Sequence, residues 1–133
     1  MKALSVRQPW AHFIVREIKP VENRQWWTQY RGPVLIHAAK VMTNFEYVDC
    51  MELAAAIAIS SKTEIPLPTF EELERGGIVG QANLVDCVTS HESPWFAGKF
   101  GFVLKNAKPL QFLAYKGQLG FFEIPDNLLG EAA

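Results

Sequence analysis

The sequence predicts an α+β fold, a small β-barrel with helices packed on its outside. Three observations support this prediction. A short apolar strand and an amphipathic helix open the chain, two T-x-x-E capping boxes mark further helices, and most of the second half alternates apolar and polar residues as strands do. The chain of 133 residues is long enough for one domain, residues 1–133, with its own core.

The first half of the chain mixes strand and helix signals. Pro9 can begin a helix, because a residue in the first turn needs no N–H partner. The helix should end at Lys19-Pro20, since the residue before proline avoids the α region. The elements predicted here are a strand at 3–6, a helix at 9–19, an extended segment at 20–27, a strand at 34–38 and a helix at 43–59.

The second half is predicted to consist mainly of strands. Thr69 and Glu72 form a capping box, so a short helix should begin there and stop at Gly76-Gly77. The alternation breaks at Asp86, where we expect a bend or bulge. The predicted strands are 78–88, 100–104, 110–114 and 120–124.

Charge is distributed unevenly along the chain. The net charge of −1 argues against a general nucleic-acid binder. However, residues 1–40 hold seven Lys or Arg against two Glu, whereas residues 41–133 hold six against twelve Asp or Glu. This asymmetry can place one basic face on a nearly neutral protein, although charges scattered over a solvated surface would give the same counts.

Several classes of protein are disfavoured by composition. With 49% apolar and 20% charged residues, the chain is expected to be globular rather than disordered. Cys50 and Cys87 lack the spacing of a zinc site or a disulfide framework, so we expect no metal and two half-buried or buried thiols. No stretch reads as a signal peptide or a membrane span, and we expect a soluble, cytoplasmic protein with no membrane partner.

The densest group of functional side chains lies between Lys19 and Trp26. If this segment is a strand, Glu22, Arg24 and Trp26 share one face, and Lys19 can reach the same space. Lysine and arginine can hold phosphate, tryptophan can stack on an unstacked base, and Glu22 can accept from an exocyclic amine or act as a general base. A surface Arg24–Glu22 ion pair with the indole packed beside it is the alternative that the spacing leaves open.

Other candidates surround this group. Gln8 and Trp10 stand at the start of the first helix, where backbone N–H groups favour anions, although Trp10 also suits the core. His37 lies in an apolar strand that leads to Lys40, and it could line a cleft or be a satisfied structural group. We find no phosphate loop, no G-x-S-x-G and no metal spacing among the three histidines, so no cofactor is expected.

Six short motifs follow one another along the chain: LSVRQPWA at 4–11, IKPVENR at 18–24, RGPVLIHA at 31–38, GIVG at 77–80, VDC at 85–87 and KGQLG at 116–120. Their order resembles the ASCH domain family, and most closely the version found in a eukaryotic transcription coactivator. The resemblance covers nearly the whole chain. It implies a PUA-like β-barrel with a cleft beside the first helix, and an association with RNA.

The resemblance also implies which residues form the cleft. Lys19, Glu22 and Arg24 fall on the central motif of the family, and the segment that carries Lys116 and Gln118 would approach from the C-terminal side. The expected nucleic-acid-binding residues are Gln8, Trp10, Lys19, Glu22, Arg24, Trp26, His37, Lys40, Lys116 and Gln118.

Three functional hypotheses remain open. The first is a module that binds single-stranded RNA or a modified nucleotide. The second is a hydrolase, because some members of the family resemble a ribonuclease or an amidohydrolase of an acylated nucleoside; Lys19 and Glu22 would then be catalytic. Glu22 stands where the amidohydrolases have a threonine, and a carboxylate replaces that hydroxyl poorly. The third is a domain that binds a protein partner. The oligomeric state is left open.

Overall fold

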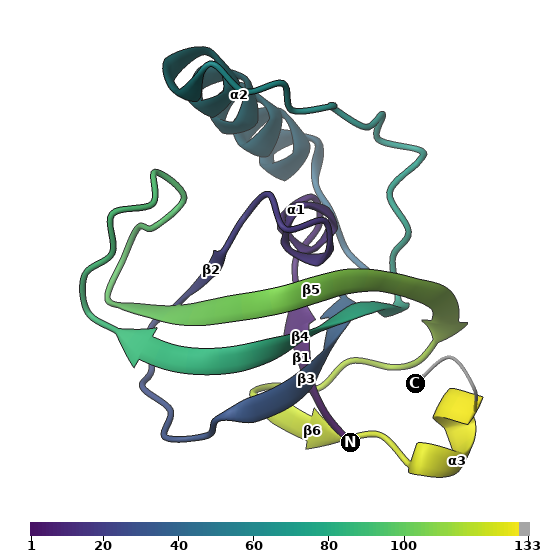
Figure 1. Ribbon diagram of the computed structural model, residues 1–133. Helices are drawn as coiled ribbons and strands as arrows, with labels where there is room; N and C mark the ends of the chain where they lie inside the picture. The colour runs from purple at the N-terminus through teal and green to yellow at the C-terminus, as the bar shows by residue number, and fades with distance from the viewer. Residues whose placement is uncertain (131–133) are drawn as a thin grey trace.

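A computed structural model describes residues 1–130 as a mixed α+β fold built on one six-stranded sheet that curls into a half-barrel (Figure 1). The α+β prediction is confirmed. The strands are β1 (Lys2–Val6), β2 (Val21–Arg24), β3 (Gly32–Ala38), β4 (Gly77–Val88), β5 (Phe100–Ala114) and β6 (Phe121–Glu123). The helices are α1 (Trp10–Val15), α2 (Asn44–Ser61) and α3 (Asp126–Leu129).

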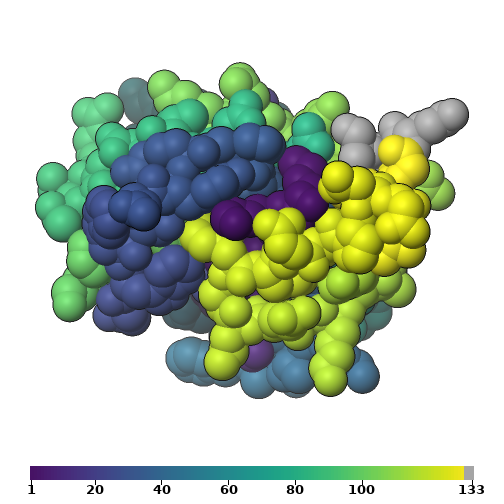
Figure 2. Space-filling view, turned by 90° about the horizontal axis from the view of Figure 1, so that it is seen from below, coloured from purple at the N-terminus to yellow at the C-terminus, as the bar shows by residue number. Residues whose placement is uncertain are grey.

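The order of strands across the sheet is β2-β5-β4-β3-β1-β6, so β2 and β6 are its two edges. Only β1 and β3 are paired in parallel; the other neighbours are antiparallel. Seen from below, the N-terminal residues lie between β3 and the C-terminal segment (Figure 2). The N-terminal strand is therefore interior to the sheet.

Side chains, rather than backbone hydrogen bonds, bring the two edges of the half-barrel together. Trp26, just after β2, meets Phe121 of β6 edge-on, with ring centroids 5.5 Å apart. It meets Phe102 of β5 in the same way at 5.1 Å. Such edge-to-face pairs contribute about 0.5–1.5 kcal/mol each beyond their burial. Trp26 thus closes the curled sheet.

Helix α1 lies between the sheet and α2 (Figure 1). Ile14 and Val15 pack on the sheet, whereas Phe13 packs with Met51 of α2. The capping box that predicted α2 is present: the Thr43 hydroxyl accepts from the amide of Glu46 at 3.1 Å, and the Glu46 carboxylate accepts from the amide of Thr43 at 2.9 Å. Within residues 1–130, no helix is both long and apolar enough to cross a bilayer.

Two predicted helices differ from those observed. The first ends at Val15 rather than at Lys19, because Glu17 adopts a positive φ of 59° and turns the chain back. The segment from Thr69 forms the hydrogen bonds of its capping box but only turns follow. Forming the first turn of a helix is unfavourable, and the few residues between Thr69 and Gly76-Gly77 leave no room for further turns to offset this cost.

The second half contains one strand fewer than predicted. The segments 100–104 and 110–114 belong to a single strand, β5, which continues through Pro109. Pro109 is tolerated because it pairs opposite Gly80, next to an irregularity in the register. The break expected at Asp86 is observed as a register shift between Leu84 and Asp86.

Candidate functional site

A cavity of about 610 Å³ opens at the seam between the two edges of the sheet, beside α1. We call it the seam cavity. Its volume falls within the range of about 300–1,000 Å³ that is usual for small-ligand sites. It is lined by Ser5, Val6, Arg7, Trp10, Lys19, Glu22, Asn23, Arg24, Ala39, Gln118, Leu119 and Gly120.

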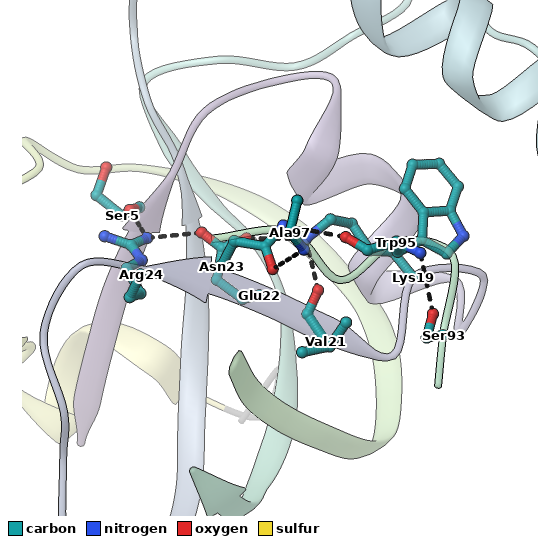
Figure 3. A network of polar contacts seen from close by, with 9 residues as sticks. All are labelled: Ser5, Lys19, Val21, Glu22, Asn23, Arg24, Ser93, Trp95 and Ala97. Atoms are coloured by element: carbon teal, nitrogen blue, oxygen red, sulfur yellow. Dashed lines mark hydrogen bonds and ion pairs between the residues drawn. The ribbon is translucent and has the colours of Figure 1, made fainter. Parts of the chain in front are cut away.

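An ion-pair network forms one wall of the seam cavity (Figure 3). The Lys19 side chain is only 1% exposed, and its ammonium donates to Glu22 Oε1 at 3.0 Å and to the carbonyl of Val21 at 2.6 Å. The other carboxylate oxygen of Glu22 lies 3.0 Å from Arg24 Nη2. That same guanidinium nitrogen donates to the carbonyl of Ser5 at 2.7 Å, which connects β2 to β1.

Local backbone geometry explains why Lys19 turns inward. After α1 ends, the amides of Ile18 and Lys19 both donate to the carbonyl of Phe13 at 3.0 Å. Together with the positive φ of Glu17, these bonds reverse the chain and bury the Lys19 side chain. The two-residue period of β2 then places Glu22 and Arg24 on the same side of the strand.

Asn23 fixes the connection between β4 and β5 against β2. Its Nδ2 donates to the carbonyl of Trp95, and its Oδ1 accepts from the amide of Ala97, both at 3.0 Å. Figure 3 shows this connection lying alongside the strand that carries the ion pairs. The wall of the seam cavity is therefore held by hydrogen bonds on both sides.

Arg24 retains an unused donor. Among the described residues, Arg24 Nε is the one buried side-chain nitrogen or oxygen without a hydrogen-bond partner. A buried polar group left unpaired costs about 1–3 kcal/mol.

A second and larger cavity, of about 980 Å³, adjoins the first. We call it the basic cavity. It shares Ser5, Arg7, Ala39, Gln118 and Leu119 with the seam cavity. Its other lining residues are His37, Lys40, Val41, Arg75, Gly76, Ala114, Tyr115, Lys116 and Gly117.

His37 has a structural environment within the basic cavity. Its Nε2 lies 2.6 Å from the carbonyl of Tyr115, which can only accept, so this nitrogen carries a proton. In the neutral ring, Nδ1 then accepts from the hydroxyl of Ser5 at 3.0 Å. Gly117 lies against this pair, and a Cβ there would come within 2.7 Å of His37 Cε1. His37 therefore joins β1, β3 and the segment after β5.

The structure brings eight of the ten predicted site residues to one of the two cavities. Trp10, Lys19, Glu22 and Arg24 line the seam cavity, and Gln118 lines both cavities. The three that line only the basic cavity are His37, Lys40 and Lys116.

Gln8 and Trp26 lie elsewhere. The buried Gln8 amide accepts from the backbone of His12 at 2.9 Å and donates to the carbonyl of Glu74 at 2.8 Å, so it joins α1 to the following loop. β2 ends at Arg24, so the strand alternation does not extend to Trp26. The Trp26 indole instead packs on Phe121 and closes the sheet. In the first turn of α1, the amides of Ala11 and His12 already bond within the chain.

Sequence reasoning missed several residues of the cavities, chiefly Ser5, Arg7, Arg75 and Leu119. Arg7 lay within a motif already noted, but its partner Glu46 is 39 residues away, bonded through Nε at 2.8 Å and Nη2 at 2.6 Å. Arg75 carried no local signal. Within residues 1–130, no group of three or more His, Cys, Asp or Glu side chains is placed to hold a metal ion.

Comparisons with known proteins bear on the family and the fold of the chain. Residues 4–115 match the ASCH domain. Over 89 residues the chain is 34% identical to human Activating signal cointegrator 1 and 33% identical to the mouse protein of that name. The matched segment is 67% of this chain but 15% of each of those proteins, so the chain corresponds to a small part of them.

Solved structures support the fold. The crystal structure of ASCH from Zymomonas mobilis aligns with a TM-score of 0.55 at 12% identity, covering 96% of this chain and 89% of that one. The ZmASCH Y47F mutant protein from the same organism aligns with a TM-score of 0.54 at 12% identity, covering 96% and 91%. At this identity the likeness concerns the fold alone.

Proposed function

This chain belongs to the ASCH domain family, as its motifs predicted, and on that premise we propose that it binds RNA by taking one unstacked base or modified nucleotide into the seam cavity. The observation that carries the proposal is the composition of the cavity. An indole, three cationic side chains and one carboxylate line a space of about 610 Å³, on a chain whose net charge is only −1.

Each side chain has a chemical role in this proposal. Trp10 offers a stacking surface, which contributes about 1–3 kcal/mol per base at single-stranded sites. Arg24, whose side chain is 19% exposed, holds a phosphate or a base carbonyl with its planar guanidinium. Glu22 accepts from an exocyclic amine, and Lys19, which is buried, positions Glu22.

Binding is favoured over hydrolysis by the environment of Glu22. Both of its carboxylate oxygens are engaged, one by Lys19 and the other by Arg24, each at 3.0 Å. Each oxygen keeps a further lone pair that can accept from an amine, but a general base that takes up a proton would lose its ionic attraction to both cations. The same arrangement holds the carboxylate rigidly for recognition.

Arg24→Ala tests the proposal. We expect the variant to lose about 10- to 100-fold in affinity for a short single-stranded RNA, the range of a charge-assisted hydrogen bond. Calorimetric titration of the chain would measure this loss. Arg31→Ala is the matched control, because Arg31 pairs with Asp86 at 3.8 Å and lines neither cavity.

Two further measurements make the outcome decisive. Arg24→Lys keeps the charge but loses the planar fork, so its affinity should fall between those of the wild type and Arg24→Ala. Urea unfolding shows whether each variant is folded. Equal RNA affinity of folded Arg24→Ala and wild type would refute the proposal, and release of a product from RNA would favour the hydrolase instead.

A further inference from the structure

Three basic side chains of the basic cavity stand just beyond the ends of three adjacent strands. In the register of the sheet, Gly77 at the start of β4 is paired with Ala38 at the end of β3 and with Ala114 at the end of β5. Lys40 lies two residues after Ala38, Arg75 two before Gly77 and Lys116 two after Ala114. Pairing across the sheet therefore gathers three cations from distant parts of the chain beyond the same end of these strands.

No acidic side chain lines the basic cavity. Arg7, which lines it too, is neutralised by Glu46. Within residues 1–130, Lys40, Arg75 and Lys116 form no ion pair with an acidic group within 4.0 Å. This arrangement leaves concentrated positive charge facing a space of about 980 Å³. A ligand with several negative charges is the complement of such a surface.

The backbone that carries these cations is fixed. The amide of Ala39 donates to the carbonyl of Val6 at 2.9 Å, and that of Gly76 donates to the carbonyl of Ala38 at 2.8 Å. The amide of Tyr115 donates to the carbonyl of Gly76 at 3.1 Å. The Arg75 guanidinium also lies 4.9 Å from the centre of the Phe70 ring. The backbone that carries the three cations is therefore preorganised, which lowers part of the cost of binding.

The two cavities adjoin each other. They share five lining residues, and Leu119 at their common border is 99% exposed. A nucleotide in the seam cavity would direct its backbone across this border. The basic cavity also has apolar lining from Val41, Ala114 and Leu119, which suits the sugars and bases between phosphates.

From these observations, and resting on the proposed function, we propose that the basic cavity binds the backbone phosphates of the nucleotides next to the one in the seam cavity. Lys40, Arg75 and Lys116 make these contacts. The preferred ligand is thus an RNA strand of at least about three nucleotides rather than a free mononucleotide, because three cations exceed what one phosphate needs.

A length series tests this inference. The chain is titrated with nucleoside monophosphates and with single-stranded RNAs of two to six nucleotides. Affinity should rise with each nucleotide up to about three and then level off. The Lys40→Ala/Arg75→Ala/Lys116→Ala variant should bind the trinucleotide at least about tenfold more weakly and keep the affinity for a mononucleotide. For the trinucleotide, the slope of log K against log salt should be shallower by about 1.4, from its two phosphate linkages at about 0.7 each.

A control variant also loses three positive charges, but at positions outside both cavities. Arg16→Ala/Lys105→Ala/Lys108→Ala removes one exposed arginine and two exposed lysines that line neither cavity. It should bind every RNA as the wild type does. Lys116→Glu, a single change at an exposed position, should weaken trinucleotide binding even if the triple variant folds poorly.

Each alternative outcome has a distinct meaning. If the wild type binds mononucleotides through Arg24 but gains nothing with length, this inference is wrong and the proposed function stands. If it binds neither monomers nor oligomers, the proposed function fails. A polyglutamate peptide that binds the basic cavity as tightly as RNA of equal charge would overturn the assignment to a nucleic-acid strand.

Discussion

Replacing Lys19 with methionine should destabilise the fold by about 3 kcal/mol. Removal of one partner from a buried ion pair costs about 3–5 kcal/mol, because the remaining charge stays buried. The lower end applies here, since Glu22 keeps Arg24 at 3.0 Å. The Val21 carbonyl also loses a donor at 2.6 Å. Methionine fills a similar volume, so little of the loss should come from a cavity.

Urea unfolding at neutral pH measures this cost. The midpoint should fall while the m-value stays unchanged, which separates a loss of stability from a change in the unfolded state. Lys19→Met/Glu22→Gln should be less destabilised than the sum of the two single variants, because neutralising both partners leaves no unpaired Glu22 charge. Lys108→Met is the matched control; Lys108 is exposed, and the change should stay within about 0.5 kcal/mol.

The reasoning has a clear refutation. If the free energy of unfolding of Lys19→Met lies within about 1 kcal/mol of that of the wild type, water already solvates the Lys19–Glu22 pair. The buried network would then not hold the site. If the two single changes are additive, Lys19 and Glu22 are not coupled. Either result would remove the positioning role assigned to Lys19.

Two further predictions concern the groups around the site. The Arg7 guanidinium, with help from Thr43, lowers the pKa of Glu46 to about 2. The stabilisation that this carboxylate gives is therefore complete above its ordinary pKa of 4.5 and is lost as the pH falls towards 2. Glu46→Gln should flatten the stability profile in that window, as measured by thermal unfolding. Gly117→Ala should cost about 1–3 kcal/mol, because the new methyl group meets His37 at 2.7 Å; urea unfolding would show it.

Either prediction can fail in a recognisable way. An unchanged profile between pH 4.5 and 2 in Glu46→Gln would mean that other carboxylates dominate the acid response. Wild-type stability of Gly117→Ala would mean that the segment after β5 shifts freely away from β3.

Local chemistry explains which parts of the fold could be predicted from the sequence. The capping box at Thr43 acts over four residues, so the pattern alone located the start of α2. Likewise the strand period alone put Glu22 and Arg24 on one side of β2. The end of α1 could not be placed, because the positive φ of Glu17 serves the burial of Lys19, which is a tertiary demand.

The basic cavity shows what a linear pattern cannot reveal. Arg75 and Lys116 are 41 positions apart in the more acidic part of the chain, and they meet only because Gly77 pairs with Ala114. Counting charge by segment could suggest a basic face but could not locate it there. The position of Trp26 could not be predicted for a related reason, since β2 ends two residues earlier and the indole packs on Phe121 outside both cavities.

Because only side chains join β2 to β6, a ligand bound between these two strands would also affect the stability of the fold. Within residues 1–130, β2 and β6 are not hydrogen-bonded to each other through their backbones. A ligand in the seam cavity that contacts Arg24 on one side and residues 118–120 on the other would therefore link the two strands. Any molecule that favours the native state adds stability through mass action, about 2.7 kcal/mol at a hundredfold excess over its dissociation constant. A nucleotide bound as we propose would therefore also stabilise the contact between β2 and β6.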